Sequence, residues 1–141
     1  MTTIAYNYEE GIIAYDSRRS VDDYIVDDNV QKHYKKDGVS FFLAGTPCDY
    51  DEFIDCYLSG ETTGEDNDAH AYTVERGEVY RAGVSLKNKI WKHPTSYSGS
   101  IGSGGRHAIT AMDMGATAKE AVKWAMKRDT GTGGRIRTFK I

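Results

Sequence analysis

The chemistry that this sequence could perform starts at its second residue. Met1 is followed by Thr2, a small residue next to which methionine aminopeptidases can cut. A freed Thr2 would hold a hydroxyl nucleophile and an α-amine, whose reference pKa of about 7.7–8.0 suits a general base. We expect activation to need only the removal of Met1, because no propeptide precedes Thr2. Sequences that start Met-Thr are common, so this pair alone does not establish a nucleophile.

Five further segments carry polar residues and glycines in a fixed order along the chain. They are Asp16-Ser17-Arg18, Asn29-Val30-Gln31-Lys32, Ala44-Gly45-Thr46-Pro47-Cys48-Asp49, Ile101-Gly102-Ser103-Gly104-Gly105 and Arg128-Asp129-Thr130-Gly131-Thr132-Gly133-Gly134. Together with the start Thr2-Thr3-Ile4, they resemble the proteasome β-subunit and HslV-like family of N-terminal-nucleophile (Ntn) hydrolases. Each motif alone is weak evidence for this family, but six motifs in the family's order and at nearly the family's spacings are strong evidence. Thr132 stands where the family has a serine.

The resemblance implies that Thr2, Asp16 and Lys32 are the catalytic threonine, aspartate and lysine. A buried Lys32 beside Thr2 would favour loss of the hydroxyl proton and keep the α-amine neutral, since one cation disfavours another nearby. Asp16 would compensate and orient Lys32, because an unpaired buried ammonium is costly. Arg18 would support the Asp16 carboxylate. Taken singly, Asp16 also fits a turn residue at a strand end, and Lys32 a solvated surface charge.

The resemblance also implies an oxyanion hole and a polar group around the α-amine. The backbone amide of Gly45, at the positive end of the helix that follows, would stabilise a tetrahedral oxyanion. Because the first turn is one residue shorter than in the family, either Ala44 or Gly45 occupies this position. Ser103, Asp129 and Thr132 would hold the α-amine and a water by hydrogen bonds.

Several other site patterns fit the sequence less well. The Gly102–Gly105 segment is followed by Arg106, so it lacks the Gly-Lys-Ser/Thr ending of a phosphate-binding loop, and it also lacks dinucleotide-binding spacing. An intact Gly-x-Ser-x-Gly nucleophile elbow does not occur. Four histidines are scattered without metal-ligand spacing: His33, His70, His93 and His107. We therefore expect no metal and no cofactor.

Length and composition limit the class of protein. The chain has 141 residues, which suits one ordinary domain. Its 18 basic and 21 acidic residues give a net charge of -3, which argues against a nucleic-acid partner. No apolar run is long enough to span a bilayer, and the start lacks the features of a signal peptide. Cys48 and Cys56 cannot make a disulfide framework, so we expect a reduced, cytoplasmic protein.

Apolar periodicity, caps and turn residues predict short strands and three helices. Thr46 is predicted to cap the first helix, and Trp124 is predicted to be buried by the last one. Arg135 and Arg137 are predicted to be solvated. The elements in order are a hairpin of 3–8 and 12–15, a polar loop at 16–20, extended pieces at 24–26 and 29–34, a strand at 39–44, a helix from Pro47 to Leu58, an acidic loop at 59–68, a hairpin of 69–74 and 79–84, a helix ending at Gly115, a helix from Thr117 to about Arg128, and a strand at 135–141.

The resemblance then implies the fold and the function. We expect an α+β fold, the four-layer αββα sandwich of Ntn hydrolases, as one domain over 1–141 that is shortened between the first helix and the second hairpin. The implied activity is that of a threonine-type peptidase acting on polypeptides, in a homo-oligomeric ring with an ATP-dependent unfoldase as partner. Two alternatives stay open: a non-catalytic family member with a structural or interaction role, and an amidase of small substrates.

Overall fold

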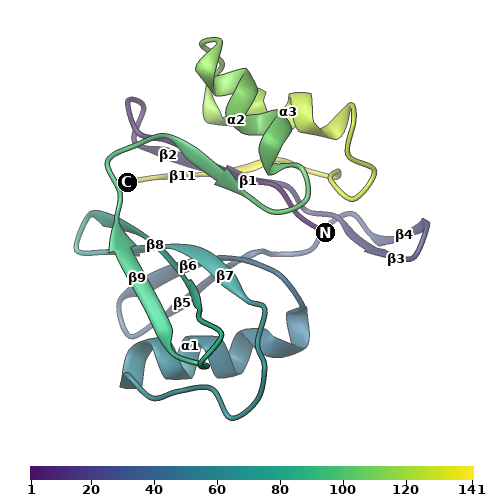
Figure 1. Cartoon of the computed structure of the whole chain (residues 1–141). Helices are drawn as coiled ribbons and strands as arrows, with labels where there is room; N and C mark the ends of the chain where they lie inside the picture. The colour runs from purple at the N-terminus through teal and green to yellow at the C-terminus, as the bar shows by residue number, and fades with distance from the viewer. The chain divides into compact units, whose positions relative to one another are not determined.

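The computed structural model describes residues 1–141, and its contacts divide the chain into two compact units. Unit 1 comprises Met1–Lys32 together with Ser96–Ile141, and unit 2 comprises His33–Thr95. Each unit has one main antiparallel sheet with helix packed on a face, so each contains one sheet layer and one helix layer of its own (Figure 1). The prediction that 1–141 forms a single domain stays a prediction.

Unit 1 is built on a four-stranded sheet covered by two helices. Its strands lie in the order β10 (Gly99–Ile101), β1 (Ile4–Asn7), β2 (Ile12–Tyr15) and β11 (Arg137–Lys140). The helices α2 (Gly105–Asp113) and α3 (Ala118–Met126) pack on β1 and β2 (Figure 1). Small side chains make this contact, and all are fully buried: Ala5 and Ala14 from the strands, and Ala108, Ala121 and Ala125 from the helices. The predicted first hairpin and last strand are confirmed.

The start of α3 is fixed by a capping box. Thr117 Oγ1 accepts the backbone N–H of Glu120 at 3.1 Å, and the Glu120 carboxylate accepts the backbone N–H of Thr117 at 3.0 Å. Two N–H groups at the helix start are thereby satisfied, as predicted. The predicted burial of Trp124 is wrong, because its side chain is 53% exposed. The buried face of α3 follows the helical repeat through Val122 and Ala125, and Trp124 lies off it.

A second, smaller hairpin follows β2 in unit 1. It pairs β3 (Arg19–Val21) with β4 (Tyr24–Asp27), and every residue of β4 is exposed. The extended piece predicted at 24–26 is confirmed. Arg19 and Ser20 belong to β3 and not to the predicted loop. The piece predicted at 29–34 is extended in a strand only from His33 onward.

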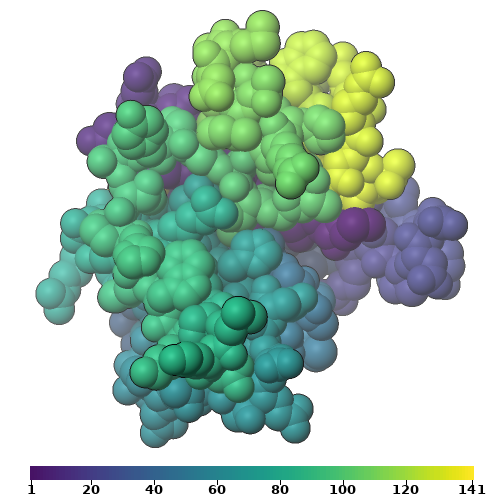
Figure 2. All heavy atoms as spheres, in the orientation of Figure 1, coloured from purple at the N-terminus to yellow at the C-terminus, as the bar shows by residue number.

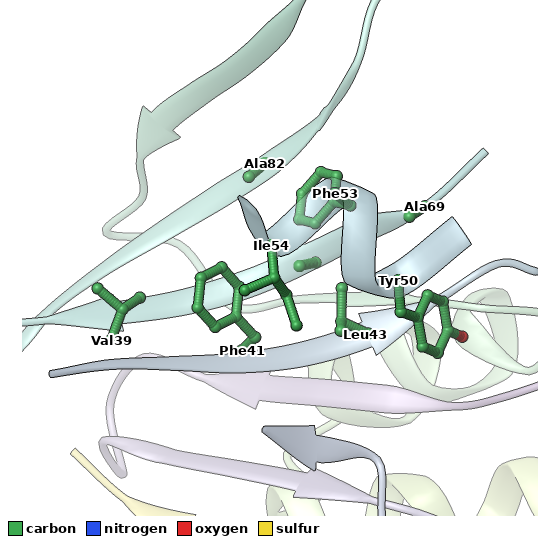
Figure 3. Close-up of a cluster of buried hydrophobic side chains, with 9 residues drawn as sticks. Val39, Phe41, Leu43, Tyr50, Phe53, Ile54, Ala69 and Ala82 are labelled. Carbon is green, nitrogen blue, oxygen red and sulfur yellow. The ribbon is translucent and has the colours of Figure 1, made fainter. Parts of the chain in front are cut away.

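Unit 2 is a five-stranded antiparallel meander. The strands follow chain order, as β5 (His33–Lys36), β6 (Val39–Ala44), β7 (His70–Glu75), β8 (Glu78–Val84) and β9 (Ile90–Pro94). Helix α1 (Tyr50–Ser59) packs on one face, where Phe53 and Ile54 join Phe41 and Leu43 of β6 in one apolar cluster (Figure 3). Burying each such side chain contributes about 1.5–3 kcal/mol. The second predicted hairpin, 69–74 with 79–84, is confirmed.

The chain enters α1 differently from the prediction. A 3-10 turn, η1 (Pro47–Asp49), precedes the helix, and Thr46 makes no side-chain cap. Its backbone N–H and its hydroxyl instead donate to the two carboxylate oxygens of Asp68, at 2.7 and 2.8 Å. Thr46 therefore holds the C-terminal end of the acidic loop, at Asp68, by two hydrogen bonds. Residues 60–69 form neither helix nor strand, as predicted for 59–68.

Cys48 and Cys56 are both free thiols, the first exposed and the second buried. No helix of the chain has the length and apolar character needed to cross a membrane.

Candidate active site

The β1–β2 hairpin places Thr2 and Thr3 beside Asp16. In its register Ile4 lies opposite Tyr15, so Thr3 and Asp16 meet just beyond the end of the ladder. The Asp16 backbone N–H donates to the Thr3 carbonyl oxygen at 3.2 Å, and the Thr3 N–H donates to Asp16 Oδ1 at 3.0 Å. A local hairpin thus brings the candidate Asp16 to Thr3, the neighbour of the candidate Thr2.

Lys32 reaches into the same place. Its Nζ lies 2.8 Å from Asp16 Oδ1, 3.1 Å from Thr2 Oγ1 and 3.0 Å from the Met1 carbonyl oxygen. Thr2 is 4%, Lys32 6% and Asp16 0% exposed, so the ion pair is withdrawn from water. Burial lowers the pKa of Lys32 below its ordinary value, and the Asp16 carboxylate opposes part of this shift. Lys32 is therefore not a solvated surface charge.

The Asp16 carboxylate is held by four donors. Its Oδ1 accepts from Lys32 Nζ and from the Thr3 N–H. Its Oδ2 accepts from the backbone N–H groups of Arg18 at 3.3 Å and of Gly133 at 3.1 Å. Hydrogen bonds to an ionised acceptor are stronger than neutral ones, so this set fixes the carboxylate and, through it, the Lys32 ammonium.

Arg18 contacts Asp16 through its backbone, while its guanidinium serves another segment. Nε and Nη2 pair with the two carboxylate oxygens of Asp28 at 2.8 and 3.1 Å. Nη1 donates to the Thr130 carbonyl oxygen at 3.1 Å. The Arg18 hydrogen bonds lower the pKa of Asp28. Arg18 therefore ties the chain after β4 to the 129–134 loop, and Asp28 is a partner that sequence reasoning missed.

Ser103, Asp129 and Thr132 form a second hydrogen-bonded group at the Thr2 nitrogen. The Thr2 N–H donates to Ser103 Oγ at 3.2 Å, and Ser103 Oγ donates to Asp129 Oδ2 at 2.6 Å. Thr132 Oγ1 donates to the same carboxylate oxygen at 2.6 Å. Burial would raise the pKa of Asp129, but the hydrogen bonds from Ser103 and Thr132 outweigh it and lower that pKa.

The Thr3 hydroxyl completes this group, and sequence reasoning missed it. Thr3 Oγ1 and Thr132 Oγ1 are 2.6 Å apart. Because the Thr132 hydrogen is committed to Asp129, Thr3 is the donor of this pair. Both threonines are buried, at 0% and 1% exposed. The chain of hydroxyls therefore links the residue that precedes β1 to the loop before β11.

Two glycines let the chain pass close to Thr2 and Thr3. Gly102 has a φ of +94°, and a Cβ there would overlap the Thr2 carbonyl. A Cβ on Gly104 would collide with the hydroxyls of Thr3 and Thr132. The Gly104 N–H donates to the Thr2 carbonyl oxygen at 3.3 Å. The Gly-Ser-Gly segment is thus a close-packed cover over these residues, which accounts for its composition.

Arg137 supports the site from β11, contrary to the prediction that it is solvated. Its Nη1 donates to Ser17 Oγ at 2.6 Å and to the Val30 carbonyl oxygen at 3.0 Å. Its Nη2 donates to Asn29 Oδ1 at 2.7 Å. These bonds hold the segment that leads into Lys32. No local signal in the sequence distinguishes Arg137 from the neighbouring Arg135.

Gly45, the predicted oxyanion donor, belongs to unit 2. It follows β6 with a φ of +118°, and a Cβ there would meet the backbone of Asp68 and Ala69. The Tyr50 hydroxyl donates to its carbonyl oxygen at 3.2 Å. A glycine is therefore needed at this position for the turn into α1. The assignment of the oxyanion amide to Gly45 or Ala44 stays a prediction.

In this arrangement the Thr2 hydroxyl contacts the Lys32 ammonium. The Thr2 nitrogen contacts a separate group of acceptors, Ser103 and, through it, Asp129. No group of three or more His, Cys, Asp or Glu side chains is arranged to hold a metal ion. While Met1 is attached, the Thr2 nitrogen is a peptide amide, which has no free lone pair for a base. Cleavage of the Met1–Thr2 bond would turn it into an α-amine at a position already bonded to Ser103.

Comparisons with known proteins decide the fold. Two solved structures of Thiobacillus denitrificans BPH match the chain. The complex with epoxomicin has a TM-score of 0.70 and 11% identity, and the match covers 99% of this chain and 97% of that chain. BPH alone has a TM-score of 0.68 and 14% identity, and the match covers 99% of this chain and 96% of that chain. Eukaryotic HslV from Trypanosoma brucei matches with a TM-score of 0.69, 15% identity and coverage of 99% and 98%. The chain has the HslV fold. The predicted α+β Ntn-hydrolase fold and the resemblance behind it are thereby confirmed.

Sequence comparison adds no family assignment. The chain matches no protein-family model and no curated protein. At 11–15% identity the structural likeness shows the fold alone and assigns no role to any residue of the site.

Proposed function

We propose that this protein is a threonine-type peptidase whose nucleophile is Thr2. The observation that carries the proposal is the buried contact of Lys32 Nζ with Thr2 Oγ1, at 3.1 Å, next to the Asp16 carboxylate at 2.8 Å. A cation so placed stabilises negative charge as it develops on the threonine oxygen. An ion pair with only a structural role would not need the Thr2 hydroxyl beside Lys32. It would also not need Ser103 as a hydrogen-bond acceptor at the Thr2 nitrogen.

The reaction follows from these contacts once the Met1–Thr2 bond has been cleaved. Thr2 Oγ1 attacks the carbonyl carbon of a peptide bond, and its proton passes to the freed α-amine, which Ser103 and Asp129 hold in place. The resemblance assigns the stabilisation of the tetrahedral oxyanion to the amide of Gly45 or Ala44. The carbon–nitrogen bond then breaks, and the leaving amine takes the proton from the α-ammonium. Thr2 is left as an acyl ester.

Water completes the cycle. The α-amine takes a proton from a water molecule, whose oxygen attacks the ester carbon. The second tetrahedral intermediate collapses, the carboxylic acid leaves, and Thr2 Oγ1 recovers its proton. Asp16 keeps Lys32 oriented through both steps, and Arg18, Thr132 and the 129–134 loop hold this geometry as positioning residues.

The setting of the activity is part of the proposal. The substrate is a polypeptide, and the working form is a homo-oligomer with the ring arrangement that the resemblance implies. An ATP-dependent unfoldase would deliver extended chains to it. The free thiols of Cys48 and Cys56 support a reducing, cytoplasmic location. The fold that the chain shares with HslV from Trypanosoma brucei supports the peptidase class.

Peptide hydrolysis by matched variants tests this function. Protein lacking Met1, verified by mass, is assayed with a mixture of fluorogenic peptides. We expect Thr2→Ala to abolish hydrolysis, Thr2→Ser to retain some, and Lys32→Met to lower it by about 100-fold or more. Lys35→Met, at an exposed lysine three residues away, is the control and should match the parent protein.

Three outcomes would overturn the proposal. Full activity in Thr2→Ala would show that Thr2 is not the nucleophile, and full activity in Lys32→Met would show that Lys32 does not act as described. No hydrolysis of any peptide by protein with a free Thr2 would favour the non-catalytic alternative. Hydrolysis of small amides without hydrolysis of peptides would favour the small-substrate amidase.

A further inference from the structure

The segment that carries Lys32 has no regular structure of its own. Residues 28–32 form neither helix nor strand, and Asn29 and Gln31 are exposed. The β3–β4 hairpin before them stands out from the surface of unit 1 (Figure 2), and every residue of β4 is exposed. Lys32 is nevertheless 6% exposed, and its Nζ has three partners at 2.8–3.1 Å. Because a lysine side chain has many rotamers, so exact a position needs a backbone that other elements hold in place.

Arg137 of β11 holds this backbone close to Lys32. Its Nη1 donates to the Val30 carbonyl oxygen at 3.0 Å, two residues before Lys32, and its Nη2 donates to Asn29 Oδ1 at 2.7 Å. Both acceptors are neutral oxygens, so these bonds fix the position of the chain and form no ion pair. A guanidinium has its N–H groups in a rigid planar fork, which lets one side chain bind several acceptors at once.

The same guanidinium also holds the strand end that carries Asp16. Its Nη1 donates to Ser17 Oγ at 2.6 Å, and Ser17 follows Asp16 directly in the chain. Ser17 is fully buried, and its carbonyl oxygen accepts the Val30 N–H at 2.9 Å. Arg137 therefore joins the two segments whose side chains meet in the ion pair of Asp16 and Lys32.

The sheet of unit 1 holds Arg137 itself. In the antiparallel pair of β11 and β2, Arg137 lies opposite Tyr15, the residue before Asp16. Its backbone is thus part of the ladder that ends at the site. Arg135, two residues earlier, lies outside β11 and is exposed, and its side chain makes none of these contacts. The chain therefore offers a matched control for the role of Arg137.

We propose that Arg137 is a positioning residue of the reaction, which joins the Lys32 segment to the Asp16 segment and so fixes Lys32 Nζ between the Asp16 carboxylate and Thr2 Oγ1. This inference rests on the proposed function of Thr2 and Lys32, and it adds a residue that lies outside all six sequence motifs. A displacement of about 1 Å from the productive geometry can lower a rate about 100-fold. Because Arg137 acts through Lys32, its loss should lower kcat and leave KM nearly unchanged.

Peptide hydrolysis by protein lacking Met1 tests the kinetic part. We expect Arg137→Met to lower kcat at least about tenfold with KM within about twofold of the parent value. Arg137→Lys keeps the charge without the fork and should lie between the two, and Arg135→Met should match the parent. Asn29→Ala, at an exposed residue, should lower kcat less, and it should have no further effect in Arg137→Met, where the Nη2 contact is already lost.

Acetylation of lysines by acetic anhydride, mapped by peptide mass spectrometry, tests the position of Lys32 without any activity. Lys32 is buried in the parent and should react slowly, whereas the exposed Lys35 serves as the internal reference. We expect Lys32 to react at least about tenfold faster in Arg137→Met and at the parent rate in Arg135→Met. Thr117→Ala, which removes a helix cap in the same unit, controls for a general loss of stability.

Several results would overturn the inference. Parent-like acetylation of Lys32 in Arg137→Met would do so whatever the activity, because Arg137 would then not hold Lys32. An equal rise in Thr117→Ala would do so as well, since the effect would then reflect stability alone. Additive losses of kcat in Asn29→Ala and Arg137→Met would show that they do not act through one contact. If the parent protein hydrolyses no peptide, the proposed function fails, and the acetylation comparison still decides whether Arg137 holds Lys32.

Discussion

Replacing Asp16 by Asn should destabilise the fold strongly, because both oxygens of the carboxylate already face donors. Oδ1 accepts from Lys32 and Thr3, and Oδ2 accepts from Arg18 and Gly133. In either orientation of the new amide, its NH2 group would point at two donors, so the Asp16→Asn variant loses hydrogen bonds as well as charge. It also leaves the Lys32 ammonium buried without its anion. Breaking a buried pair in this way costs about 3–5 kcal/mol.

The companion substitution Lys32→Met should cost less. It leaves the Asp16 carboxylate with the three backbone N–H donors of Thr3, Arg18 and Gly133. We expect a loss of about 1–3 kcal/mol. In the double variant no unpaired ammonium remains, so its loss should fall short of the sum of the two single losses by more than about 1 kcal/mol.

Urea unfolding at neutral pH, followed by far-UV circular dichroism, measures these losses. Asp23→Asn and Lys35→Met change the same residue types at exposed positions and should each shift the free energy of unfolding by less than about 0.5 kcal/mol. A loss under about 1 kcal/mol in Asp16→Asn would refute the reasoning. Additivity of the two single losses within about 0.5 kcal/mol would do the same, since it would show that the two groups do not interact.

Three further predictions concern acid stability, capping and close packing. The pKa of Asp129 is lower in the folded chain than its ordinary value, so the stability it contributes is present above about pH 4 and is lost as the pH falls through the folded value; Asp129→Asn should flatten the fall in unfolding free energy between about pH 5 and pH 2. Thr117→Ala removes a cap of α3 and should cost about 1 kcal/mol in urea unfolding, whereas a neutral result would contradict the capping role. Gly104→Ala should destabilise by more than about 1 kcal/mol, because its Cβ would strike the Thr3 hydroxyl; Gly64→Ala, where the nearest atom is 3.6 Å away, should not, and equal effects would argue against the close approach.

The features that sequence reasoning predicted correctly are the local ones. The first hairpin follows from alternating apolar residues around a turn, and the capping box of α3 from Thr117 and Glu120 three residues apart. The order of the motifs also pointed to the fold. Thr2, Asp16 and Lys32 come together largely because one hairpin and the segment after it carry all three.

The features that it missed depend on contacts between distant segments. Arg137 donates a hydrogen bond to the carbonyl oxygen of Val30, 107 residues away, and the residues next to it in the sequence do not predict this contact. Thr46 has the residue type of a helix cap, but Asp68 competes for its hydroxyl from 22 residues away. Trp124 is apolar and helical, yet the small residues of α3 occupy the buried face. Residue type sets what a side chain can bind, and tertiary packing selects the partner.

The most direct test of the central claim is the intact mass of the protein before and after exposure to a peptide epoxyketone. This electrophile needs both a threonine hydroxyl and a free α-amine on the same residue, which only a processed Thr2 would supply. We predict that protein lacking Met1 gains the mass of one inhibitor, that fragmentation places it on Thr2, and that Thr2→Ala gains none. Protein with a free Thr2 that remains unlabelled, or an adduct that maps to another residue, would contradict the claim.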